Sequence, residues 1–250
     1  MARAASLNSD WLPCYGWWPP PDEVLATVVM SPYHAATESD AVFHFTLRGY
    51  LGSSTPLWEY EVGELALGEE GAVRLSDLGV VPEAHDGGIL EVHGVRLDRE
   101  PRRGIGFVGQ WIDAETTDGG GYIIPTIPIR AQRKDTKRDD LQVVPGIQVS
   151  RDVTTEVLLL NVVDEPTEVR LVATSTEGLT IEAPPFTIDP WTPRRVDLRR
   201  AVPGLRRLLE PDDGMGSLAI YSTHRLLPYF GYRRDGGPLL SLDHTAPIFA

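Results

Sequence analysis

Short segments in which apolar and polar residues alternate run along almost the whole chain. They are rich in β-branched or aromatic residues and are bounded by Gly, Pro, Asp or Ser, which is typical of strands separated by turns. The 21 prolines and 24 glycines would interrupt long helices. The pattern predicts an all-β protein with one short helix at 202–209 and a counterpart in the first half near Leu75 to Val81. The clearest strand segments are residues 23–30, 41–51, 89–97, 121–131, 155–163, 168–175, 179–188 and 217–223.

Four segments of the first half recur in the second half, in the same order and at similar spacing. Both series end in Pro-Ile-x-Ala, and such recurrence indicates one structural unit present twice. Residues 72–80, 87–96, 105–111 and 119–131 correspond to 194–204, 215–225, 228–234 and 236–250. We therefore predict two tandem, related β-sandwich repeats of an immunoglobulin-like or similar type. The first covers 1–132 and carries an aromatic N-terminal arm, the second covers 141–250, and a charged linker at 133–140 joins them.

The formal net charge of −13 limits the choice of partners. A chain this acidic repels phosphate backbones and anionic lipid headgroups, so we expect neither nucleic acid nor a membrane as a partner. The single cysteine, Cys14, excludes an intramolecular disulfide, and its aromatic and apolar neighbours predict a packing residue and not a nucleophile. We expect the protein in the cytoplasm, because no apolar run reaches membrane-spanning length and the first residues lack the apolar stretch of a signal peptide.

Common catalytic and nucleotide-binding motifs are missing from the sequence. It has no Walker loop, no dinucleotide glycine fingerprint, no nucleophile elbow and no HExxH. The run Gly119, Gly120 and Gly121 precedes a predicted strand, which favours a hairpin turn over an anion-binding loop. The sequence therefore does not decide whether the chain is an enzyme.

Histidines are the candidates for a metal-dependent enzyme, the alternative class of function. A sandwich can bring metal ligands together from different strands without a local spacing motif. His44 and His93 lie inside predicted strands, on the face opposite their apolar neighbours, where a solvated position is favoured. Asp243 and His244 would point to opposite faces of a strand and form no acid-base pair unless a bulge intervenes. A divalent transition metal would use ligands from His34, His44, His93, His224 and His244.

Aromatic residues gather in the N-terminal arm, outside the repeat pattern. Trp17, Trp18 and Tyr33 belong to it. The arm either covers an open sheet edge or face, or it forms a surface on which sugars or flat ligands stack. Trp111 falls inside the repeat, where we expect a core or groove position. Together these four residues form the candidate ligand site.

A repeated unit without a catalytic signature predicts a non-catalytic ligand-binding or assembly protein. Two stacked sandwiches leave a groove between them, and domain interfaces are a usual place for ligands. We expect a small-molecule or carbohydrate ligand there and no resident cofactor. Sandwich edges need cover, so a homodimer or a larger protein assembly is also expected. The competing prediction is a metal-dependent enzyme of hydrolase-like or isomerase-like type.

Overall fold

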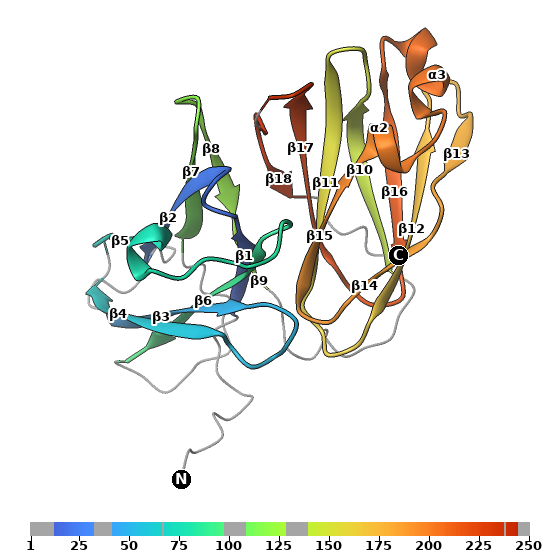
Figure 1. The fold of residues 1–250 in the computed structure, drawn as a ribbon. Coiled ribbons are helices and arrows are strands. Elements are labelled where there is room, and N and C mark those ends of the chain that lie inside the picture. Colours follow the sequence, from blue (N-terminus) through green and yellow to red (C-terminus); the bar gives the residue numbers. More distant parts are fainter. Residues whose placement is uncertain are drawn as a thin grey trace.

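The structure is a computed structural model that describes residues 13–32, 42–66, 68–97, 109–128, 140–237 and 239–244. These residues form four antiparallel sheets, two in each half of the chain (Figure 1). The all-β prediction is confirmed.

The first half is built from sheets A and B. Sheet A has the strand order β4-β3-β6-β1-β9, and sheet B has the order β5-β2-β7-β8. The bounds are β1 Cys14–Trp18, β2 Val24–Ser31, β3 Val42–Tyr50, β4 Trp58–Ala66, β5 Gly71–Arg74, the 3-10 helix η1 Leu75–Leu78, β6 Gly88–Arg96, β7 Gly109–Thr116, β8 Gly121–Pro125 and β9 Ile127–Pro128.

The second half is built from sheets C and D. Sheet C has the order β10-β16-β12-β13, with β14 also paired to β12, and sheet D has the order β15-β11-β17-β18. The bounds are β10 Asp140–Gln148, β11 Val153–Asn161, β12 Thr167–Thr174, β13 Thr180–Glu182, β14 Phe186–Ile188, β15 Thr192–Asp197, α2 Leu198–Ala201, α3 Leu205–Leu209, η2 Glu210–Asp212, β16 Met215–Ser222, β17 Leu227–Arg234 and β18 Asp243–His244.

The two halves share one strand order. Leaving β9 aside, the order β4-β3-β6-β1 of sheet A matches the order β13-β12-β16-β10 of sheet C, position by position. The order β5-β2-β7-β8 of sheet B likewise matches the order β15-β11-β17-β18 of sheet D. This correspondence follows the sequence order of both halves, and it pairs the same segments that resemble each other in sequence.

Strand β2 illustrates how the residue pattern builds a sheet face. Val24, Ala26, Val28 and Met30 are buried in the core of the first half, because successive side chains of a strand point to opposite faces. Leu25, between two of them, is exposed on the other face of sheet B. In β12 of the second half, the same alternation buries every second residue.

The predicted helix at 202–209 is present as α3, Leu205–Leu209, and a separate short helix, α2, precedes the predicted range at Leu198–Ala201. Pro203 cannot donate a backbone hydrogen bond, and Gly204 has a positive φ of 86°, so the chain turns between α2 and α3. Asp197 caps α2 by accepting a hydrogen bond from the Arg199 N–H at 2.9 Å. The counterpart expected near Leu75 to Val81 is the 3-10 helix η1.

Two hydrophobic cores organise the molecule. One lies between sheets C and D of the second half. The other fills the first half and continues onto the outer face of sheet D, where Leu158, Leu160 and Tyr229 pack against it. In Figure 1, sheet D is the sheet of the second half that lies nearer the first half. We call this contact region between the halves the seam.

The last residue of the predicted linker at 133–140 is the first residue of a strand. Strand β9 ends at Pro128, and β10 already begins at Asp140. Asp140 pairs with Ser222 of β16, so it belongs to the second half. The rest of the predicted linker lies outside the described residues.

Candidate functional site

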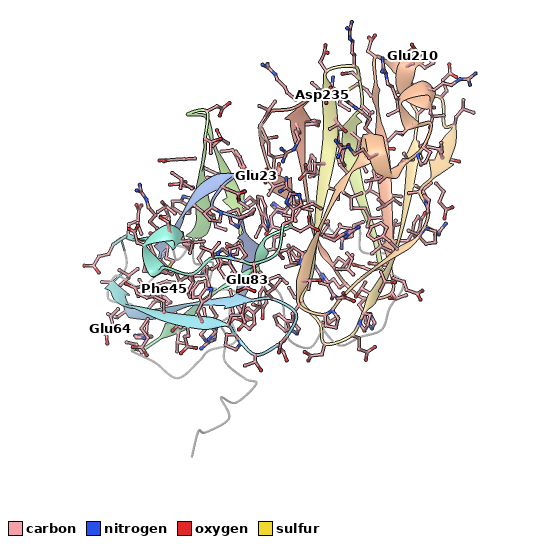
Figure 2. The ribbon with its side chains drawn as sticks, viewed as in Figure 1. Glu23, Phe45, Glu64, Glu83, Glu210 and Asp235 are labelled. Carbon is pink, nitrogen blue, oxygen red and sulfur yellow. The ribbon has the colours of Figure 1, made fainter. Side chains whose placement is uncertain are left out.

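A groove of about 870 Å³ lies at one end of the seam. The first half contributes Glu23, from the turn between β1 and β2, together with His85 and Asp86, which precede β6. The second half contributes β15, α2, the segment 183–186 and the turn after β17. Figure 2 shows Glu23 at the edge of the first half that faces the second, and Asp235 on the second half. The groove expected between the halves is therefore present at this end of the seam.

Four charged side chains of the groove lining pair with one another, and we call them the clasp: Glu23, Glu156, Arg195 and Arg233. Arg195 donates to both carboxylate oxygens of Glu23, with 2.9 Å between Nη2 and Oε1. Its Nε donates to Glu156 Oε1 at 2.6 Å. Arg233 donates from Nε to Glu156 Oε2 at 2.8 Å and from Nη2 to Glu23 Oε1. The clasp thus ties the first half to three strands of sheet D.

The clasp is charged but neutral in sum. Burial would raise the pKa of Glu23, but the guanidinium groups of Arg195 and Arg233 outweigh it and lower that pKa. Burial opposes the charge on Arg195, yet its two carboxylate partners raise its pKa. The guanidinium of Arg195 also lies 5.3 Å from the centre of the Trp17 ring. Glu23 and Arg195 therefore stay ionised at neutral pH. In formal charge, the two carboxylates and two guanidinium groups of the clasp cancel.

Above the clasp, three exposed arginines line the groove: Arg194, Arg200 and Arg234. Arg200 has Asp197 as a partner, at 3.5 Å from Nε. Within the described part of the chain, neither Arg194 nor Arg234 forms an ion pair. The acidic lining residues Asp197 and Asp235 already contact the backbone N–H and the guanidinium of Arg199, respectively. A third acidic residue, Asp86, also lines the groove. Arg194 and Arg234 are nevertheless exposed guanidinium groups with which an anionic group can pair.

The segment between β13 and β14 supplies an apolar wall. Pro184 and Pro185 are exposed, and Phe186 is half-buried at the start of β14. Ala183 anchors the segment: it is buried, and its N–H donates to the Leu171 carbonyl at 3.0 Å. The groove thus combines exposed guanidinium groups with a short apolar surface.

A second polar cluster lies on the outer face of sheet A, around the buried carboxylate of Glu91. Tyr50 Oη donates to Glu91 Oε2 at 2.7 Å, and Arg48 Nη1 donates to Oε1 at 3.0 Å. Arg48 also reaches Glu59 at 2.5 Å, and burial lowers the pKa of the neighbouring His93. Every group around Glu91 named here is engaged within sheet A, so this cluster is a structural ion-pair network.

Two of the aromatic residues expected to form a ligand site are in the core. The Trp17 and Trp18 side chains are buried, and Trp17 donates from Nε1 to the Asp86 carbonyl at 2.8 Å. They close the first core and leave no ring face for a ligand. Trp111 is half-buried on the outer face of sheet B, away from the groove lining. Tyr33 lies outside the described residues.

The histidines of the metal alternative are spread over the fold. His44 and His93 lie on the outer face of sheet A, and His244 is exposed in β18. His224 is buried, with its Nε2 3.3 Å from Glu165 Oε2 and its Nδ1 3.5 Å from Thr167 Oγ1. His34 lies outside the described residues. Among the described residues, no group of three or more His, Cys, Asp or Glu side chains could hold a metal ion.

Cys14 is buried in β1, where it packs in the first half. Burial raises the pKa of its thiol to about 12, so the reactive thiolate is scarce at neutral pH.

Sequence reasoning missed the arginines of the groove. The available signal was a set of doublets in the second half, at 194–195, 199–200 and 233–234. A further doublet, Arg206 and Arg207, lies exposed on α3 outside the groove lining. Doublets alone therefore do not separate groove residues from other surface arginines.

Comparisons with known proteins identify no family. No protein-family model matches the chain, and no curated protein matches it. Among solved structures, a β-glucuronidase from glycoside hydrolase family 2 aligns with 93% of this chain at 9% sequence identity and a TM-score of 0.16. The alignment spans 23% of that enzyme's chain. A likeness at this TM-score carries no argument about fold or function.

Across the described residues, no helix has the length and apolar character needed to cross a membrane.

Proposed function

We propose that the chain is a non-catalytic binding protein whose groove at the seam takes a ligand carrying acidic groups. The observation that carries this proposal is the placement of Arg194, Arg200 and Arg234 around the groove. The chain as a whole has a net charge of −13 and would repel an anion over most of its surface. Exposed arginines gathered in one concave place offset that repulsion locally, since they balance the carboxylates of the lining.

The size and lining of the groove support a small or short ligand. Its volume of about 870 Å³ falls in the usual range for ligand sites, roughly 300 to 1,000 Å³. Guanidinium groups pair with carboxylates and phosphates through two parallel hydrogen bonds, which a neutral molecule cannot match. Pro184, Pro185 and Phe186 offer contact to a short apolar part of the same ligand. A neutral sugar is disfavoured, because Trp17 and Trp18 are buried in the core and Trp111 lies outside the groove lining.

The shared strand order supports an origin by duplication, and the groove lies where the two halves differ. In the first half, the short strand β5 and η1 occupy the place that β15, α2 and α3 occupy in the second. Arg194 and Arg200 belong to this longer stretch of the second half. We therefore assign the binding function to a feature that the second half has and the first half lacks. The cytoplasm is the location we propose, since a single buried thiol needs no oxidising compartment.

Isothermal titration calorimetry at constant ionic strength tests the proposal, with citrate as the acidic probe and maltose as the neutral one. We expect citrate to bind and maltose not to bind. The double variant Arg194→Ala and Arg234→Ala should weaken citrate binding by about thirtyfold or more, because two charged hydrogen bonds of roughly 1 kcal/mol or more each are lost.

The matched control is Arg206→Ala with Arg207→Ala, which removes two exposed arginines outside the groove lining. This control should bind citrate as the unchanged chain does. Equal losses in both double variants, or binding of maltose in place of citrate, would contradict the proposal.

A further inference from the structure

The groove covers one end of the outer face of sheet D, where Thr154 and Glu156 of β11 line it, and it extends to the edge of β15. Arg194, Arg195, Val196 and Asp197 all line it, although they are consecutive in a strand. Neighbouring side chains of a strand point to opposite faces, so a groove over one face would be lined by every second residue. Lining by all four shows that the groove reaches past the outer face to the edge of β15, with the segment 183–186 on one side and Glu23, His85 and Asp86 on the other.

This edge has backbone groups available for pairing. Within the described residues, β15 pairs with β11 alone. Pro193, opposite Leu160, has no N–H and so fits a position whose backbone points away from β11. Alternation then gives Arg195, two residues further on, the same outward direction for its N–H and C=O. The pairing between β11 and β17 is consistent with this direction. The same alternation turns the backbone N–H and C=O of Leu159 toward β15, so its partner on β17 forms no hydrogen bond with Leu159. That partner is Pro228, which has no N–H.

We propose that the groove receives an extended segment of a partner protein, with acidic side chains, which adds to sheet D as a strand beside β15. This inference rests on the proposed function and narrows its ligand from an acidic molecule to an acidic peptide. Backbone hydrogen bonds to Arg195 supply the pairing, as in other cases of strand addition. The exposed arginines supply the preference for acidic side chains.

The dimensions of the edge set the length of the peptide. The four residues from Arg194 to Asp197 cover about 13 Å, at roughly 3.4 Å per residue, so they match a peptide core of about four residues. Side chains of an added strand alternate between two sides. One set faces Arg194 and Phe186, and the other faces the clasp and His85. An acidic residue at every second position therefore places carboxylates on the Arg194 side.

Hydrogen exchange of the Arg195 backbone amide tests the inference directly. The probe is the capped hexapeptide acetyl-Glu-Val-Glu-Val-Glu-Val-amide, added to the 15N-labelled full chain. We expect exchange at the Arg195 amide to slow by at least tenfold at saturation, while exchange in α3 is unchanged. The double variant Arg194→Glu and Arg234→Glu should bind the peptide at least tenfold more weakly, and the Arg206→Glu and Arg207→Glu control should bind it normally.

Two N-methylated peptides test whether the backbone hydrogen bonds to β15 come from one edge of the peptide. One carries N-methyl groups on its glutamates and the other on its valines. Strand addition predicts that one of them loses binding and the other keeps it, because amides of alternate residues point to opposite edges. If both bind as well as the parent peptide, or if the Arg195 amide is not protected, strand addition is wrong even when citrate binds.

Other outcomes are equally decisive. If neither the peptide nor citrate binds, both the inference and the proposed function fail. If light scattering finds a dimer of the free chain with its Arg195 amide already protected, the occupant of the edge is a second copy of this chain and not an acidic partner.

Discussion

The seam has an apolar end and a charged end, and one face of sheet D supplies both. The outward positions of β11 are Thr154 and Glu156 toward the groove, then Leu158 and Leu160. Two steps along a single strand thus change the seam from charged to apolar. The apolar end is filled, whereas the charged end remains open as a groove. The comparison teaches that apolar packing joins the halves at one end, whereas at the other the ion pairs of the clasp join them beside an open groove.

The apolar end is tightly packed by aromatic residues from both halves. The Trp191 ring centre lies 4.8 Å from that of Tyr50 and 6.0 Å from that of Tyr15. Tyr229 Oη donates to the Pro125 carbonyl at 2.9 Å, and the Gly52 N–H donates to the Trp191 carbonyl at 2.9 Å. Apolar burial together with these hydrogen bonds makes this end the main source of cohesion.

Removing the central aromatic ring should produce the largest loss of stability. We expect Trp191→Ala to lower the free energy of unfolding by about 3 to 5 kcal/mol, because a large buried ring is replaced by a cavity. Trp111→Ala is the matched control, since that ring is half-buried on the outer face of sheet B, and it should lose less than half as much. Urea denaturation followed by circular dichroism measures both, and equal losses would show that the seam is not the cohesive element.

Breaking the clasp should have a smaller effect. We expect Glu23→Gln to lower the free energy of unfolding by about 2 kcal/mol, because two partly buried arginines lose their shared carboxylate. The control Glu59→Gln removes an exposed partner of Arg48 and should change stability by about 0.5 kcal/mol or less. The same denaturation assay compares them, and a Glu23 variant as stable as its control would mean that the clasp does not join the halves.

The clasp also predicts how stability depends on pH. Because the pKa of Glu23 is lowered in the folded chain, its contribution is complete above the unfolded value of about 4.3 and is lost as pH falls through the folded pKa. The decline in stability below about pH 4.3 should therefore be shallower in Glu23→Gln than in the unchanged chain. Denaturation midpoints from pH 6 down to pH 3 measure this, and parallel curves would contradict it.

The smallest stability effect is expected at the open end. Arg194→Ala should change the free energy of unfolding by no more than about 0.5 kcal/mol, since the side chain is exposed and forms no ion pair within the described residues. Citrate affinity should nevertheless fall when measured by calorimetry. A variant that loses stability and keeps its affinity would reverse the roles assigned to the two ends.

The sequence predicted the strands whose pattern is set by local alternation. Segments 23–30 and 168–175 correspond to β2 and β12 within a residue or two at each end. It missed β4, in which Glu59, Glu61 and Glu64 interrupt the apolar pattern because the strand lies at the edge of sheet A. The sequence also did not predict β1. All five residues of β1 are buried, so its sequence lacks the alternation of apolar and polar residues and was interpreted as an aromatic arm.

The sequence predicted that a groove would lie between the halves, but it did not predict which residues line it. Its residues come from a turn of the first half and from separate strands of the second, and their convergence depends on how the halves pack. Local patterns carry no record of that packing. Trp17 and Trp18 were weighed as ligand-binding residues for the same reason, since sequence alone does not reveal that both side chains are buried in the core of the first half.

The most direct test of the central claim is a citrate titration of the 15N-labelled chain followed by amide chemical shifts. The account predicts that the perturbed amides belong to the groove, at Arg194, Gly236 and Gly237, while the indole N–H of Trp111 is unchanged. Perturbations centred on Trp111 and the outer face of sheet B, with none in the groove, would contradict it.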